Sequence, residues 1–238
     1  MAEHPILTAA DVDTAVFALR PDYRALLIDI DGIPPGDSDD TSEALLRRAE
    51  TTAQDLLGHS AVEDLPHIGA WREAYRAFGA KPQRTRNSLE ALTRRAAIGL
   101  PRVNRLTDIY NAISVIHQVP IGGEDLATYV GGPRLVRATG TESFATMANG
   151  ENVIEHPEPG EVVWCDDLGV TCRRWNWRQG PRTQLTPDTT SALFILDALA
   201  PMLDDALSNA AGDLIGQLQG LNPDLHVSTR LISAEEHP

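Results

Sequence analysis

Apolar residues recur at helical spacing in four segments of the first half of the chain. Trp71, Tyr75 and Phe78, for example, follow one another at i, i+4 and i+7, which places them on one face of a helix that packs into a core. Capping residues precede such segments and glycines follow them, as is typical of α-helices. The predicted helices are residues 43–57 after the caps Asp40, Thr41 and Ser42, residues 68–78 before Gly79, residues 89–99 after Ser88, and residues 103–118.

Short apolar runs separated by turn residues dominate the second half. Their β-branched and aromatic residues alternate with Gly, Asn and Asp-Asp pairs, which predicts antiparallel strands, with Asp166 to Gly169 at the tip of a hairpin. The predicted strands are residues 134–140, 143–149, 161–167 and 170–177, with a further strand pair in residues 15–33 broken by a turn at Pro21 and Asp22. A turn at residues 120–123 and two helices, residues 190–207 and 210–218, complete the prediction.

The fold class that follows is α+β, with a helical first half packed on a sheet-rich second half. A chain of 238 residues with 42% hydrophobic side chains is long enough to bury a sizeable core. No linker or repeat divides it, so we expect one domain over residues 1–238, with its core in about residues 20–200 and C-terminal helices and a tail in residues 201–238.

The net charge of −14 is distributed unevenly along the chain. Acidic residues outnumber basic ones by 14 to 4 in residues 1–64 and by 8 to 1 in residues 183–238, whereas residues 65–182 hold 12 acids and 15 bases. A uniformly acidic surface repels nucleic acid, but a basic middle does not. The middle of the chain is therefore where a phosphate-rich partner would bind.

Arginine clusters mark two places in this basic middle. Arginine binds phosphate through a planar fork and stacks on bases, although an arginine bias can also come from codon composition, so only the clustering is informative. The predicted tRNA-binding residues are Arg84, Arg86, Arg94 and Arg95 in one cluster and Arg174 and Arg178 in the other.

Common signatures of enzyme chemistry are absent from the sequence. The seven histidines include no pair at i, i+3 or i+4, and two cysteines, Cys165 and Cys172, cannot complete a zinc site alone, so we expect both thiols to be reduced and structural. We expect neither a metal nor a cofactor. No apolar run of membrane-spanning length and no export signal is present, which favours a cytoplasmic protein without a membrane partner.

Residues 100–126, LPRVNRLTDIYNAISVIHQVPIGGEDL, resemble a segment of the editing domain of the phenylalanyl-tRNA synthetase β-subunit, which reads R-x-x-N-x-V-V-D-x-T-N-Y followed by a P-x-H-A-F-D turn. Residues 134–152 are similar to that domain's next strand pair, with Arg137, Ala138, Glu142 and Gly150 at matching positions. The resemblance covers about residues 20–200, without any synthetase active site or anticodon-binding region. It implies a free-standing editing-type domain of the same fold.

The activity implied by this resemblance is hydrolysis, in trans, of the aminoacyl ester at the 3′ end of a mischarged tRNA. The partner is then tRNA, and no DNA partner is expected. Such a site positions water and substrate, so the lack of a Ser-His-Asp triad or a metal does not argue against hydrolysis.

The resemblance also implies the site residues, position by position. Asn111 matches the pocket asparagine of that domain, and Asp125 matches the aspartate that closes its turn. Gly122 stands where the pocket histidine would be, and Gln179 or Asn176 lies nearest the place of the pocket glutamate. The expected catalytic residues are Asn111, Gly122 and Gln179, and the expected substrate-binding residues are Asn176, Thr190, Gly123 and Asp125.

Structural interpretations of the same residues remain open. Asn111 suits a buried helix position, Gly122 a turn, Gln179 a polar surface, and Asp125 and Thr190 helix N-caps. If residues 170–177 continue as one strand, Trp175 and Trp177 pack on one side while Arg174, Asn176 and Arg178 face a ligand on the other. A tRNA or other nucleic-acid binding module without activity, or a small amino-acid-binding protein, remains the alternative function.

Overall fold

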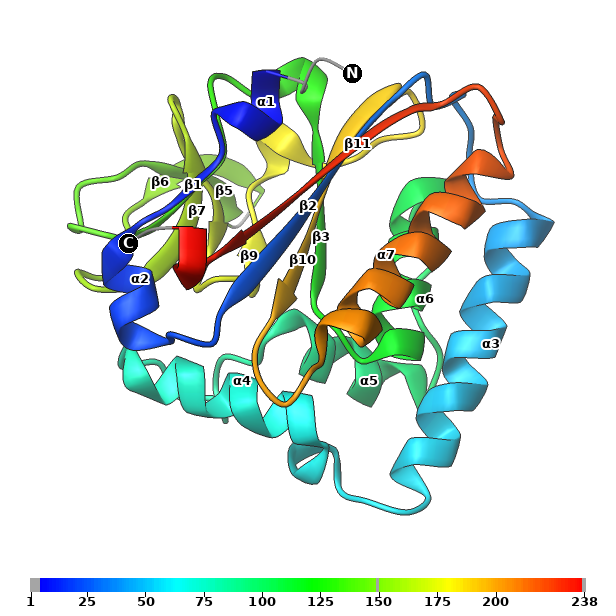
Figure 1. Ribbon diagram of the computed structural model, residues 1–238, viewed down its shortest axis with the longest axis horizontal. Helices are drawn as coiled ribbons and strands as arrows, with labels where there is room; N and C mark the ends of the chain where they lie inside the picture. The colour runs from blue at the N-terminus through cyan, green and yellow to red at the C-terminus, as the bar shows by residue number, and fades with distance from the viewer. Residues whose placement is uncertain (1–4, 149, 237–238) are drawn as a thin grey trace.

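The computed structural model describes residues 5–148 and 150–236, and in that part of the chain helices and strands form a mixed α+β fold, as the sequence predicts (Figure 1). Residues 1–4, 149 and 237–238 lie outside the described residues, and with them lie His4, His237, the last residue of the predicted strand 143–149, and the two ends of the expected domain.

A four-stranded antiparallel sheet occupies the centre of the molecule. Its strand order is β11-β2-β10-β3, formed by β11 (His226–Ser233), β2 (Arg24–Asp31), β10 (Ser191–Ala198) and β3 (Ile121–Asp125). The two inner strands are apolar on both faces because both faces of the sheet are covered.

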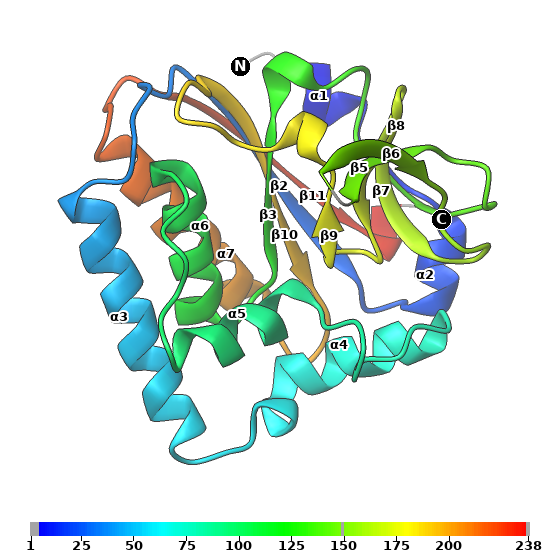
Figure 2. The ribbon, with the colours of Figure 1, turned by 180° about the vertical axis from the view of Figure 1, so that it is seen from behind.

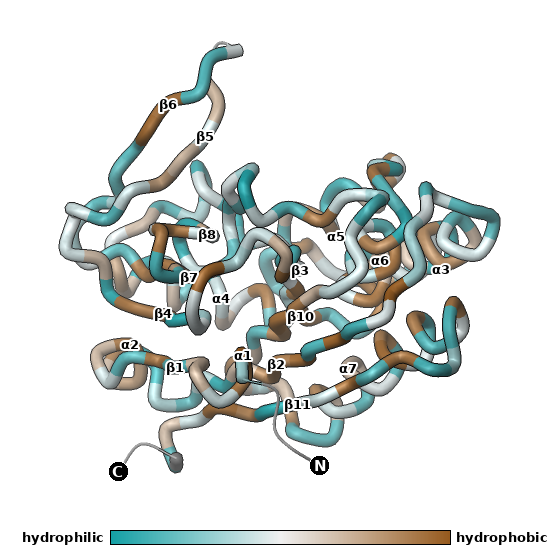
Figure 3. The backbone as a smooth tube through the Cα atoms, turned by 90° about the horizontal axis from the view of Figure 1, so that it is seen from above, coloured by the Kyte–Doolittle hydropathy of each residue, from teal (hydrophilic) through white to brown (hydrophobic). Residues whose placement is uncertain are grey.

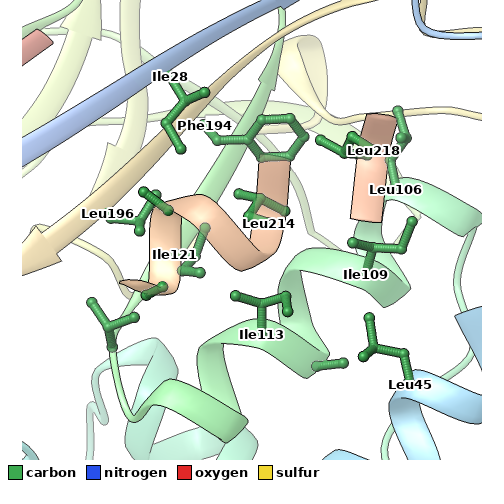
Figure 4. Close-up of a cluster of buried hydrophobic side chains, with 14 of the residues drawn as sticks. Ile28, Leu45, Leu106, Ile109, Ile113, Ile121, Phe194, Leu196, Leu214 and Leu218 are labelled. Carbon is green, nitrogen blue, oxygen red and sulfur yellow. The ribbon is translucent and has the colours of Figure 1, made fainter. Parts of the chain in front are cut away.

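Helices cover one face of this sheet. They are α3 (Asp40–Leu57), α6 (Arg105–His117) and α7 (Asp204–Gln219), which Figure 1 shows stacked beside the sheet, with α5 (Ser88–Ala96) at one end. Phe194 and Leu196 of β10 pack against Ile109 and Ile113 of α6 and Leu214 of α7 (Figure 4). This apolar core holds α6 against β3, so residues of both elements reach the same space.

The opposite face of the central sheet packs on a second sheet. Its strands, in the order β1-β4-β7-β8-β9, are β1 (Asp11–Val12), β4 (Arg134–Arg137), β7 (Val162–Asp166), β8 (Gly169–Arg173) and β9 (Arg178–Gln179). Trp71, Tyr75 and Trp175 are fully buried between them, joined by residues of α2 (Thr14–Leu19) and α4 (Pro66–Ala77). Figure 2 shows this five-stranded sheet with the molecule seen from behind.

Two short elements lie at the edge of this arrangement. The helix α1 (Pro5–Thr8) precedes β1, and the hairpin of β5 (Phe144–Ala148) and β6 (Glu151–Glu155) projects from the body of the molecule (Figure 3). Met147 and Ile154 are exposed on this hairpin.

Most of the helices expected in the first half are confirmed, with small shifts at their caps. The N-cap of α3 is Asp39, which forms a reciprocal capping box with Ser42, and the N-cap of α5 is Asn87 rather than Ser88. The helix α4 buries Trp71 and Tyr75, and Gly79 follows it with a positive φ of 91°. The β7–β8 hairpin turns at Asp166 to Gly169, as predicted.

Three segments that form or precede the central sheet differ from the predicted secondary structure. Residues 14–19 form a helix instead of a strand, because Asp13 caps it by accepting from the N–H of Ala15. Residues 120–123 belong mostly to a strand, since Gly122 and Gly123 pair with β10. Residues 191–198 are a strand and not a helix, because an apolar run covered on both faces has no distinguishing period.

The last strand was not predicted at all. The strand β11 is an edge of the central sheet, and its three apolar residues, Val227, Leu231 and Ile232, do not alternate regularly with its polar ones. Backbone pairing with β2 holds this segment as a strand, although its composition does not predict one.

Candidate functional site

A cavity of about 270 Å³ lies between the two sheets and is the place where most of the predicted site residues meet. Residues of α5 and α6 form one side, β3, β9 and β10 form another, and the chain between β8 and β9 closes it. Its walls are largely aromatic and apolar, with Trp164, Trp175, Trp177 and Tyr110 among them. A cavity with apolar walls and few polar groups is the usual form of a small-ligand site.

Four residues predicted from the sequence line this cavity: Asn111, Gly122, Asn176 and Gln179. They come from α6, β3, the turn after β8, and β9, so the fold brings together positions that are up to 68 residues apart. Asn111 is 8% exposed, and within residues 5–148 and 150–236 no group makes a hydrogen bond with its side-chain amide. A nearly buried amide without a protein partner retains its capacity to bind a ligand.

Gln179 is held firmly, in contrast to Asn111. Its Nε2 donates to the carbonyl oxygen of Gly123 at 2.7 Å and to Oε2 of Glu124 at 2.8 Å. Gly123 itself leaves no space for a side chain, because an added Cβ would lie 2.7 Å from Leu185 Cδ1. The glycine therefore allows β3 to approach the layer behind it.

Asn176 belongs to a buried polar network behind the cavity. Its Nδ2 donates to Asp197 at 3.2 Å, while Tyr75 donates to its Oδ1 at 3.0 Å and Tyr23 donates to the other Asp197 oxygen at 2.6 Å. The chain enters this network through Arg174 and Trp175, whose φ angles are 49° and 67°. Two consecutive residues other than glycine in the left-handed region carry backbone strain, which the packing of Trp175 against Tyr23 and other rings offsets.

Two buried acids of the cavity wall were missed by the sequence analysis. Glu124 of β3 and Asp197 of β10 both line the cavity, and burial raises the pKa of each carboxyl to about 7. The sequence analysis did not assign β3 and β10 as strands. In the paired strands, Gly122 and Glu124 share a face with Ile195 and Asp197, so both acids lie on the cavity side.

Cys172 also lines the cavity, but burial raises the pKa of its thiol well above 9, so it stays protonated and is a poor nucleophile. Ser88 contributes a buried Oγ that has no hydrogen-bond partner among the residues that the structure describes. Over the described ranges, no group of three or more His, Cys, Asp or Glu side chains has the arrangement of a metal site. The chemistry available in the cavity is therefore that of amides, carboxyls and a hydroxyl.

The remaining predicted substrate-binding residues lie outside the cavity lining. Asp125 caps the short 3-10 helix Leu126–Thr128 by accepting from Ala127, and its other oxygen accepts from Thr189 at 2.6 Å. Thr190 is exposed and precedes β10, so its predicted role as a helix N-cap is wrong.

The first cluster of predicted tRNA-binding arginines surrounds the start and the exposed face of α5. Arg84, Arg86, Arg94 and Arg95 are all exposed, and the same helix supplies Ser88, Ala91 and Leu92 to the cavity. Arg94 and Arg86 lie 3.0 and 3.7 Å from the fully buried carboxylate of Glu90, which Arg72 also contacts. Arg84 and Arg95 have no ion pair in the described part of the chain, so their charges are available at the rim.

The second cluster surrounds Trp177. The Arg174 guanidinium carbon lies 4.6 Å from the centroid of one Trp177 ring, and that of Arg178 lies 5.8 Å away. The predicted alternation of residues 174–178 along a strand is wrong, because β8 ends at Arg173 and a tight turn follows. Trp175 therefore points into the core, whereas Trp177 is partly exposed at the cavity.

Comparisons with known proteins show which family this chain belongs to. Residues 70–207, more than half of the chain, match the B3/4 domain, which is found in the phenylalanyl-tRNA synthetase β-subunit. Among solved structures, an N-terminal fragment of that subunit from Pyrococcus horikoshii is 12% identical with a TM-score of 0.45; the match covers 94% of this chain and 50% of the fragment. No curated protein matches significantly. No helix in the described residues is long and apolar enough to cross a bilayer. The chain belongs to the B3/4 domain family.

Proposed function

We propose that this protein hydrolyses the ester bond of a mischarged aminoacyl-tRNA in trans. Family membership supports a tRNA-related role, because the B3/4 domain is found in a tRNA synthetase subunit. The exposed arginines of α5 support contact with a phosphate backbone next to the cavity. The match does not extend over a whole synthetase, so the activity is proposed for this chain alone.

The observation that carries the proposal is the amide of Asn111, which has no hydrogen-bond partner among the described residues and lies in a mostly apolar cavity. A fixed dipole in a site that excludes water stabilises a developing oxyanion more strongly than water does. Gly122 contributes space, because an added Cβ there would meet nothing within 4 Å. Gln179, fixed by Gly123 and Glu124, holds β9 against β3 and so fixes the far wall.

The reaction needs no protein nucleophile. A water oxygen attacks the ester carbonyl carbon, and the bond from that carbon to the ribose oxygen breaks. One water proton passes to the ribose oxygen, and the other is released as the amino-acid carboxylate forms. The neighbouring ribose hydroxyl of the tRNA can relay the first proton, while Asn111 stabilises the charge on the carbonyl oxygen.

A deacylation screen tests this proposal. The protein is incubated with a broad panel of correctly charged and mischarged tRNAs, and the remaining aminoacyl ester is measured over time. We expect accelerated loss from at least one mischarged tRNA, slowed about 100- to 1,000-fold by Asn111→Ala. If the protein binds tRNA tightly and deacylates no member of the panel, it is not a hydrolase.

A second function, amino-acid or tRNA binding without hydrolysis, is favoured by one observation. The amide donors of Gln179 and Asn176 already have protein acceptors, which leaves Asn111 as the open amide among these three. The same screen separates the two functions, because a binding protein would protect the ester instead of cleaving it.

A further inference from the structure

The buried acids of this protein differ in the groups that face them. Away from the cavity lining, Asp108 and Asp125 accept from backbone N–H groups and hydroxyls. Glu90, Glu161 and Asp166 are each paired with arginine, as buried carboxylates usually are. Glu124 and Asp197 have no arginine, lysine or histidine within ion-pair distance in the described part of the chain, although both are 3% exposed or less. These two acids are the ones that line the cavity.

Hydrogen bonds hold the two carboxyls in place without neutralising them. Glu124 accepts from Gln179, and Asp197 accepts from Tyr23 and Asn176. All of these donors are neutral, so an ionised carboxylate in the cavity lacks a positive partner. A cationic ligand would supply it, because an ammonium group beside a buried carboxylate forms a charge-assisted hydrogen bond.

Independent features of the cavity also suit an ammonium ligand. Trp164, Trp175 and Trp177 line the same space, and the Trp177 ring already holds the Arg174 and Arg178 guanidiniums at 4.6 and 5.8 Å, as a ring that attracts cations does. Asn111, 8% exposed, and Ser88 Oγ present polar groups without protein partners to the same cavity. Aromatic walls, a carboxylate and free polar groups form the arrangement by which proteins recognise organic cations.

We propose that the cavity binds a primary ammonium group, with Glu124 as its anchor and Asp197 as a second acid in the lining of the same cavity. If the proposed deacylase function holds, the ammonium belongs to the aminoacyl group, either at its α-position or at the end of a basic side chain. Binding of an amine is measured without tRNA, so its failure is distinguishable from failure of the hydrolysis screen.

The test uses butylammonium chloride as the probe and n-butanol as its uncharged counterpart. Three of the four tryptophans line the cavity, so their fluorescence reports occupancy. We expect saturable binding of butylammonium and none of butanol. Glu124→Gln, which keeps an acceptor for Gln179, should weaken amine binding about tenfold or more. The matched control is Asp213→Asn on α7, where the acid contacts His117 outside the cavity.

A pH series on the wild-type protein gives a second measurement that requires no variant. Since the two carboxyls have pKa values of about 7, amine binding should strengthen as they ionise from about pH 6 to about pH 8. The other titratable or charged groups that act on these acids are Tyr110, Tyr129, Asp166, Cys172 and Arg182 for Glu124, and Tyr23, Tyr75 and Cys172 for Asp197. The raised pKa values of the tyrosines and of Cys172 keep them neutral over this range.

Two further amines distinguish the source of the ammonium. Tight binding of alaninol indicates an α-ammonium ligand, and tight binding of Nα-acetyllysinamide indicates a side-chain ammonium. Equal binding of butanol and butylammonium, or wild-type affinity in a folded Glu124→Gln variant, would overturn the proposal.

Discussion

Asn111 and Gln179 present chemically identical amides to one cavity, but their surroundings give them different tasks. Protein acceptors hold the Gln179 Nε2, whereas the described structure gives the Asn111 side chain no partner. The first residue is thus suited to shaping the wall and the second to contacting a ligand.

Replacement of Asn111 tests this difference. Asn111→Ala should lower deacylation by a factor of about 100 to 1,000, which is typical for loss of a positioned hydrogen-bond donor. Gln179→Ala should also lower the rate, but with loss of thermal stability, since Gly123 and Glu124 lose their donor. Single-turnover deacylation and thermal unfolding together separate the effects. Asn152→Ala on the exposed hairpin is the control, and a normal rate in Asn111→Ala would remove Asn111 from the site.

Ionisation of the buried Glu124 carboxyl should lower the free energy of unfolding, in addition to its proposed role in ligand binding. Its pKa of about 7 in the fold exceeds the ordinary 4.5, so the unfolded chain loses the proton first as the pH rises. The penalty is absent below pH 4.5, grows up to pH 7 and is constant above it. Glu124→Gln should therefore raise the free energy of unfolding by about 3 kcal/mol at alkaline pH and by little at acid pH. Urea unfolding at both pH values measures this, and a destabilised variant at alkaline pH would contradict it.

At the scale of elements, α5 combines two roles on one face. Ala91 and Leu92 line the cavity, and Arg95, four and three residues further along the helix, lies on the same side and is exposed, with Arg84 in the loop before the helix. Arg86 and Arg94 instead lie against the buried Glu90 and help to neutralise it. Only part of the predicted arginine cluster is therefore free to meet phosphate.

This division guides the choice of variants for tRNA binding. Replacing Arg84 and Arg95 together by glutamine should weaken tRNA binding and reduce the slope of log affinity against log salt by about 1.5, since each phosphate contact contributes about 0.7 to 0.9. Arg47→Gln with Arg48→Gln on α3 changes the net charge equally, away from the cavity lining. Equal salt slopes for the two double variants would show that α5 is not the tRNA contact.

Sequence patterns predicted helices better than they predicted strands. The segments α3, α4, α5 and α6 each show a one-sided apolar stripe, so their period is readable. The buried strand β10 shows no period, and β3 contains two glycines that are typical of turns. Glu124 and Asp197 lie on these two strands and match no pocket position of the resembled domain, so they were not recognised as site residues, whereas Asn111 and Gly122 were named from such positions.

Over the whole molecule, packing between the central sheet and α4 depends on a neutral histidine. His67 Nε2 accepts from the N–H of Leu199 at 3.1 Å, so its Nδ1 carries the proton and donates to the carbonyl of Gln118 at 2.7 Å. Burial lowers the pKa of His67 to about 4, from an ordinary value of 6.5. One imidazole thus joins α4, the end of α6 and the end of β10.

Acid should destabilise the protein through this residue. The unfolded chain binds a proton at His67 below pH 6.5 but the fold resists it down to about pH 4, so stability is complete above pH 6.5 and falls as the pH drops through this window. The loss should reach about 3 kcal/mol. His67→Gln should unfold at a lower temperature than the wild type at neutral pH. Its unfolding temperature should, however, fall less steeply as the pH is lowered through this window. An unchanged acid limb would rule out His67 as the cause.

Two neighbouring glycines of β3 differ in the space that is available for a side chain. Gly123 has atoms of three side chains crowded around the place of a Cβ, whereas Gly122 has none within 4 Å. A methyl group at position 122 would therefore occupy space that belongs to the ligand and not to the core. A substitution at position 122 alone can therefore narrow the range of molecules that the cavity admits, while the core packing around Gly123 stays unchanged.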